Sequence, residues 1–233
     1  MTGTRPSLRS AALAGLGLGV ALAYPIALER VRASWGPRST GAAVLAAWLV
    51  SLALLRRNRA IPGLGTLSRV GLLALPVLAM ATGSELYLRL VPAAIQASLV
   101  GVFLLSLRGG SSLFGEAARL VQPYAPDFIE PYCRKATLAF AALFAAQAAV
   151  LVMLVFRPPV AGWALASSAL IWLPLLLLSA LEWSVRKVWF RHYGRGPVDG
   201  LLRRLLPPER TARGRRSLEH IRRVRAELGL PPP

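Results

Sequence analysis

The chain has 233 residues and carries 28 Lys and Arg against 10 Asp and Glu, which gives a formal net charge of +18. Hydrophobic residues nevertheless make up 55% of the chain, and the mean hydropathy is +0.52. A soluble nucleic-acid-binding domain seldom reaches this hydropathy, and a disordered basic tail would be poor in apolar residues. We therefore expect the charges to be separated from the apolar residues, as they are in a helical membrane protein.

Stretches without a charged residue recur along the chain. A hydrocarbon core of about 30 Å requires roughly 20 helical residues, and Arg69 can snorkel to lengthen the third stretch. The pattern predicts an all-α polytopic transmembrane helical bundle of about six spans, at 10–28, 39–55, 67–84, 90–107, 136–156 and 160–184. Residues 1–185 are then the transmembrane domain, and 186–233 are a basic cytoplasmic tail with short amphipathic helices.

The basic residues predict the orientation. Six spans place the N and C termini on one side of the membrane, and 23 of the 28 basic residues lie on that side. The positive-inside rule assigns this side to the cytoplasm. A five-span arrangement would move the basic tail to the other side and remove the bias.

The connections between spans differ in length. On the far side, Glu85 to Arg89 are expected to form a tight turn. On the cytoplasmic side, Ser111 and Ser112 can cap a short amphipathic helix that stops at Pro123. We expect this helix to lie at the membrane interface, with a substrate-gating role as the alternative.

Basic and aromatic residues alternate around the end of the sixth span. Cationic side chains near a bilayer attract anionic headgroups by about 1 kcal/mol each. We expect such contacts with membrane lipids from Arg134, Lys135, Arg186, Lys187 and Arg191. The same pattern could bind RNA, but its place directly after a span favours lipid, and no nucleic-acid partner is expected. Farther on, 217–228 is predicted to be a short helix that docks on the membrane or on a partner.

Few polar groups lie within the predicted spans, and each is a candidate functional residue. Glu182 ends the sixth span, and Arg186 follows one helical turn later, so a structural ion pair is the alternative to a functional carboxylate. Gln147 and Gln96 lie in the middle of the fifth and fourth spans. We expect them to form hydrogen bonds between helices, with a polar path as the alternative.

Motifs for catalysis or cofactor binding are missing from the sequence. Cys133 is the single cysteine, and His192 and His220 are far apart, so we expect no metal site. There is no nucleophile elbow, phosphate loop or dinucleotide fingerprint. We therefore expect no cofactor, and a non-enzymatic role is favoured while an enzymatic one stays open.

Short segments from Val91 onward carry a resemblance to a known family. They are Val91-Pro92, Val102 to Arg108, Glu116 to Leu120, Tyr132 to Thr137, Trp163-Ala164 and Glu182-Trp183. In these the chain resembles an uncharacterised family of bacterial inner-membrane proteins, which is distantly similar to the intracellular septation protein family. The chain departs from it at Gln147, where that family tends to have Asn, and at Ala166-Ser167-Ser168, where Tyr-Asn-Gly is expected.

This resemblance implies a function and a location. Members of the family often accompany genes for aryl-polyene or xanthomonadin-type lipid pigments. The chain is thus expected to be an accessory or scaffold protein of lipid or polyene biosynthesis in the bacterial inner membrane, with membrane or cytoplasmic biosynthetic proteins as partners. The alternatives are a small transporter or lipid-handling membrane enzyme that uses Glu182 and Gln147, and a cell-envelope or septation factor.

Overall fold

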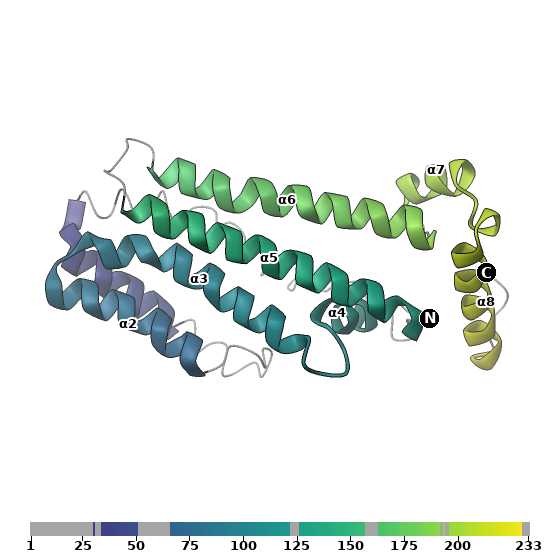
Figure 1. Ribbon diagram of the computed structural model, residues 1–233, viewed down its shortest axis with the longest axis horizontal. Coiled ribbons are helices and arrows are strands. Elements are labelled where there is room, and N and C mark those ends of the chain that lie inside the picture. Colours follow the sequence, from purple (N-terminus) through teal and green to yellow (C-terminus); the bar gives the residue numbers. More distant parts are fainter. Residues whose placement is uncertain are drawn as a thin grey trace. The chain divides into compact units, whose positions relative to one another are not determined.

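The computed structural model describes residues 30, 34–50, 66–121, 126–156, 163–191, 193 and 196–229. Every regular element in these ranges is a helix (Figure 1), which confirms the all-α prediction for this part of the chain. The first predicted span, 10–28, lies outside the described residues. The second lies within them only up to residue 50, and residues 34–50 are helical.

Three helices are long and apolar enough to cross a membrane. They are α3 (Glu85–Ser106), α5 (Glu130–Val155) and α6 (Trp163–Phe190), and they correspond to the fourth, fifth and sixth predicted spans. A shorter helix, α2 (Thr66–Thr82), corresponds to the third. The chain therefore has the character of a membrane protein, while six spans and their orientation stay a prediction.

The start of α3 corrects the predicted turn at Glu85 to Arg89. The turn lies at Gly83 and Ser84, where Gly83 has a φ of +69°, and Glu85 begins the helix. The Ser84 hydroxyl accepts a hydrogen bond from Leu86 N at 3.4 Å, and Arg89 pairs with Glu85 at 3.1 Å. An acidic residue in the first turn and an ion pair four residues apart both favour helix, so charge does not mark the helix end here.

The helices α5 and α6 also continue past their charge-free stretches. α5 begins at Glu130 and α6 ends at Phe190. Arg134, Lys135, Arg186 and Lys187 therefore lie on helices, where the sequence had placed them in a loop and a tail. A helix ends where its backbone hydrogen bonds end, and that point need not coincide with the first charged residue.

The contacts divide the chain into two units, and α3, α5 and α6 each contribute residues to both. The first unit is Met1–Val102 with Ala141–Pro174, and the second is Phe103–Phe140 with Leu175–Pro233. In the first unit, Val44, Ala79 and Leu88 form a core. A Cβ on Gly41 would lie 3.0 Å from the Pro76 carbonyl oxygen, so a glycine permits the helix at 34–50 to approach α2 closely.

The second unit contains α4 (Leu113–Val121), η1 (Asp127–Ile129), α7 (Pro197–Leu205), η2 (Pro208–Arg210) and α8 (Ala212–Glu227). As predicted, α4 is a short helix that begins after Ser112. Its first amide groups are all bonded: Ser112 N to Glu130 Oε1 at 2.7 Å, Leu113 N to Ser106 Oγ at 3.3 Å, Phe114 N to Thr137 Oγ1 at 3.4 Å and Gly115 N to Ser112 Oγ at 3.2 Å. Side chains of α3 and α5 thus hold the amino end of α4.

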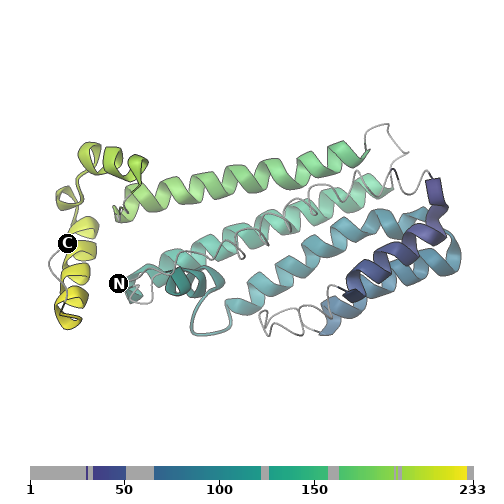
Figure 2. The same cartoon turned by 180° about the vertical axis from the view of Figure 1, so that it is seen from behind.

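The tail folds back on the end of α6. Lys187 pairs with Asp199 at 2.6 Å, Arg191 Nη1 donates to Pro207 O at 2.6 Å and the Tyr193 hydroxyl donates to Leu206 O at 2.8 Å. α8 begins before the predicted residue 217, because Thr211 caps it by accepting from Gly214 N at 3.1 Å. Figure 2 shows, as does Figure 1, that α8 runs across the direction of the last turns of α6.

Candidate functional site

The second unit contains a cavity of about 400 Å³, which is within the usual range for small-molecule sites. Residues of α4, η1, α5, α6 and α8 line it. Its apolar lining is Phe114, Ala117, Ala118, Pro126, Ile129, Trp183, Phe190 and Ile221. Its polar lining is Tyr132, Cys133, Glu182, Arg186, Lys187, Ser217 and His220.

Glu182 is the buried carboxylate of this cavity, with a side chain only 10% exposed. The Tyr132 hydroxyl lies 3.3 Å from Oε1 and 3.2 Å from the backbone oxygen of Glu182. Arg186 Nη2 lies 3.4 Å from Oε2. Charge-assisted hydrogen bonds are usually about 2.7–2.9 Å long from a guanidinium and about 2.5–2.7 Å long from a hydroxyl. Because both side-chain contacts are longer than this, the carboxylate keeps acceptor capacity for a further donor.

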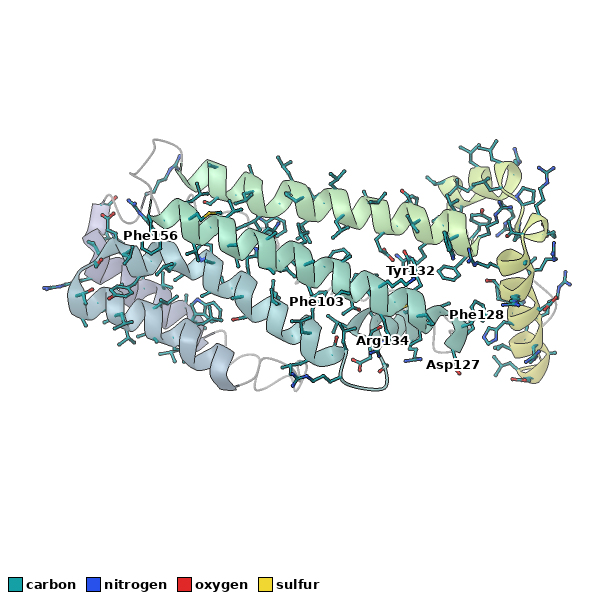
Figure 3. All side chains as sticks on the ribbon, in the orientation of Figure 1. Phe103, Asp127, Phe128, Tyr132, Arg134 and Phe156 are labelled. Atoms are coloured by element: carbon teal, nitrogen blue, oxygen red, sulfur yellow. The ribbon has the colours of Figure 1, made fainter. Side chains whose placement is uncertain are left out.

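Tyr132 is held in place from two sides. Its ring meets Phe190 edge to face, with 5.1 Å between the ring centres, and Figure 3 shows the side chain reaching from α5 toward α6. Phe114 of α4 packs against two other rings, with 4.9 Å between its ring centre and that of Phe140 and 6.5 Å to that of Phe103. Aromatic packing thus fixes the α4 and α5 walls of the cavity.

The wall formed by α8 is attached to α6 and η1. The Arg213 guanidinium stacks over the Trp189 ring at 4.0 Å, and His220 meets Phe128 edge to face at 6.5 Å. A Cβ on Gly214 would overlap the Pro208 carbonyl group, so α8 and η2 can pack only with glycine at this position. The residues of α8 that line the cavity are therefore presented by a docked helix.

The structure brings three of the predicted site residues into this cavity, namely Glu182, Arg186 and Lys187. The ion pair expected between Glu182 and Arg186 is present, and the charge of Lys187 is balanced by Asp199. Arg134 donates to Leu107 O at 2.7 Å, and Arg191 holds Pro207 O. Lys135 is exposed on α5. Contact of these residues with lipid headgroups stays a prediction.

Gln147 lies in the first unit and donates to a backbone carbonyl that Pro174 leaves without its helical donor. Pro174 has no N–H to donate to the carbonyl four residues earlier, that of Leu170. Gln147 Nε2 donates to Leu170 O at 3.1 Å and to Ile171 O at 2.9 Å. Gln96 is also buried, and its Oε1 has no hydrogen-bond partner among the described residues. Neither glutamine lines the cavity.

Sequence reasoning missed most of the cavity. In the sequence, Tyr132 stood out only as the start of one segment of the family resemblance, and His220 only as one of two histidines too far apart for a metal site. Within the described ranges, no group of three His, Cys, Asp or Glu side chains is placed to hold a metal ion. The signal that could have found the cavity is the face of α8 that carries Ser217, His220 and Ile221, since it mixes polar and apolar groups.

Comparison with family models, with curated proteins and with solved structures gives no match to this chain.

Proposed function

We propose that the chain is an inner-membrane accessory protein of lipid or polyene assembly, and that its cavity binds an amphipathic molecule taken from the lipid phase. The cavity carries this proposal, because it combines aromatic and aliphatic walls with one buried carboxylate at the ends of two helices that are apolar enough to cross a membrane. The resemblance to envelope-associated membrane proteins supports the same role.

The position of the cavity favours a ligand that reaches it through the bilayer. Leu177 is 72% exposed, and Leu176 and Leu181 on the same helix are exposed as well. Exposed leucines on a long apolar helix suit contact with acyl chains. Glu182 follows these leucines directly, so the cavity lies where the first charged residues interrupt the exposed apolar surface of α6. Amphipathic molecules gather at this depth of a membrane.

The chemistry of the cavity selects the head of the ligand. The open acceptor capacity of Glu182 favours a hydroxyl or amine donor, while the aromatic and aliphatic lining favours an apolar chain. A hydrogen bond to a charged group contributes about 1.5–3 kcal/mol, which corresponds to roughly tenfold or more in affinity. A carboxylate head would meet the like charge of Glu182, while the two cations of the lining are already paired, Arg186 with Glu182 and Lys187 with Asp199.

Quenching of tryptophan fluorescence tests the proposal, because Trp183 lines the cavity. The purified chain in detergent is titrated with 11-bromoundecanol, 11-bromoundecanoate and 1-bromoundecane. We expect saturable quenching by the alcohol, loss of that component in Trp183→Phe, and roughly tenfold weaker binding in Glu182→Gln. Equal binding of all three probes would contradict the assignment of the head group.

A matched pair of variants separates the cavity from the helix surface. Ala118→Leu fills the cavity, whereas Ala180→Leu adds the same atoms to an exposed position on α6. Only the first should abolish saturable quenching. Unchanged membrane lipids and pigments after deletion of the gene would overturn the biological role, and a reporter fused after Pro233 that is active outside the cytoplasm would overturn the orientation.

A lipid-handling enzyme is the second candidate function, and the pairing of Tyr132 with Glu182 favours it. A phenol beside a carboxylate in a cavity can donate and accept a proton. If the chain is an enzyme, Tyr132→Phe should abolish turnover of the bound amphiphile and leave its binding nearly unchanged. A binding protein would show no turnover in either form.

A further inference from the structure

The helix α8 has two faces of different character. Gly214 and Ser217 are buried, and Ser217, His220 and Ile221 line the cavity. At 3.6 residues per turn, Arg215, Arg216, Arg222 and Arg223 fall on the opposite side of the helix. All four are exposed, and together they are called the arginine face.

The charge of the arginine face is largely uncompensated. Glu219 lies between these arginines and Glu227 lies four residues after Arg223. Within the ranges that the structure describes, none of the four arginines forms an ion pair with an acidic residue. Arg215 Nη1 donates to Glu209 O at 2.9 Å, and most of its five N–H donors have no partner among the described residues. Rows of guanidinium groups suit carboxylates, which they bind through two parallel hydrogen bonds.

The two tail helices differ in the surface that they offer. α7 exposes Val198, Leu201 and Leu205, an apolar stripe at helical spacing that suits a membrane interface. In α8 the apolar side is occupied instead, because it covers the cavity and the end of α6. Its arginine face is therefore directed away from α6 and its apolar surface. α8 also contains no Phe, Tyr or Trp on which bases could stack.

We propose that the arginine face of α8 is a docking surface for an acidic helix on a soluble cytoplasmic protein. Arg215 with Arg222, and Arg216 with Arg223, are spaced two helical turns apart, which matches carboxylates repeated along one side of a helix. The stacking of Arg213 on Trp189 and the packing of Gly214 on Pro208 hold α8 in place, so binding requires little ordering of the surface. The proposal rests on the cytoplasmic orientation of the tail but not on the ligand of the cavity.

The test uses the full chain in nanodiscs of zwitterionic lipid and a fluorescent helical peptide with glutamates repeated every three to four residues. Arg215, Arg216, Arg222 and Arg223 are replaced together by Gln. We expect the peptide to bind at least about tenfold more weakly to this variant, and its affinity for the unaltered chain to fall as salt rises. Binding of 11-bromoundecanol should stay unchanged, which separates this result from the function proposed for the cavity.

A matched control removes four exposed charges elsewhere, with Arg108, Lys135, Arg204 and Arg210 replaced by Gln. Peptide binding should change less than about twofold in this control. Equal losses in both variants would show nonspecific attraction and overturn the proposal. Tighter binding of a single-stranded RNA, or loss only of binding to vesicles rich in anionic lipid, would also overturn it, because the occupant would then be a different class of partner.

Discussion

The carboxylate of Glu130 accepts a hydrogen bond from the backbone N–H of Ser112 at 2.7 Å. Ser112 is fully buried, so this amide has no access to water. Gly115 lies so close to the same carboxylate that an added Cβ would overlap it. An acidic residue at the start of α5 thus binds the amino end of α4, where the helix dipole favours negative charge.

Glu130→Ala should destabilise the second unit by about 1–3 kcal/mol, because it leaves the Ser112 amide buried without a partner. Gly115→Ala should act in the same direction by forcing the carboxylate away. Thermal unfolding in detergent measures both. Glu116→Ala is the control, since Glu116 is exposed and its carboxylate accepts from Ser111 Oγ alone among the described residues, and its effect should stay within about 0.5 kcal/mol.

The contact of Gln147 with Leu170 O should depend on Pro174. Gln147→Leu removes the donor that satisfies the carbonyl freed by the proline, and interhelical bonds of this kind contribute about 0.6–1.7 kcal/mol in membranes. Pro174→Ala restores an N–H within α6. In that background, Gln147→Leu should lower the free energy of unfolding by much less. A double-mutant cycle on unfolding free energies tests this, and a coupling of zero would disprove the relationship.

Lys187 and Asp199 should hold the tail on α6 through their ion pair. Both side chains are mostly buried. Asp199→Asn should therefore lower the free energy that holds α7 in its docked position by roughly 1–3 kcal/mol. Hydrogen exchange of the α7 amides reports the loosening. Exchange of the two charges, Lys187→Asp with Asp199→Lys, should restore part of the protection, and failure of both single and double variants to alter exchange would contradict this role.

Docking of the tail should weaken at alkaline pH through Tyr193. Burial raises the pKa of the Tyr193 phenol, Asp199 adds to the rise and Arg191 opposes it. The neutral phenol, which donates to Leu206 O, is therefore favoured in the folded state. The neutral phenol contributes fully to the stability of the docked tail below the ordinary tyrosine pKa of about 10. This contribution is lost as the pH rises through the higher pKa of Tyr193 in the folded state.

Ultraviolet difference spectra measure this titration. Subtracting the spectrum of Tyr193→Phe from that of the unaltered chain should give one phenolate transition above pH 10, and protection of α7 should fall over the same interval. In the variant, protection should be lower at neutral pH and lack this step. A transition at the ordinary pKa would show that Tyr193 is not buried by the docked tail.

The sequence predicted the features that depend on local pattern. The apolar stretches predicted the positions of α3, α5 and α6, and Ser112 predicted the start of α4. Helix periodicity and capping depend on residues close together in the sequence, so they can be recognised without the fold. Helix ends were less well predicted. Glu85 and Glu130 are charged and yet begin helices, since acidic residues stabilise a first turn as well as a loop.

The cavity was beyond sequence reasoning for a different reason. It joins Tyr132, Glu182 and His220, which are far apart in the chain. Tyr132 meets Glu182 where α5 packs against α6, and His220 reaches them only when α8 docks on α6. That docking depends on Gly214, because any side chain at this position would overlap the Pro208 carbonyl group. A glycine in an arginine-rich segment gives no sign of such a contact before the fold is known.

The bond from Gln147 to Leu170 O also bears on how the chain enters a membrane. A carbonyl without a donor is costly in hydrocarbon, so α6 alone would carry an uncompensated group one turn before its proline. α5 precedes α6 in the chain, and its glutamine is already available when α6 is synthesised. The two helices should therefore be inserted as a hairpin. Moving α6 ahead of α5 by circular permutation should lower the yield of inserted protein more than it lowers the stability of the protein that is obtained.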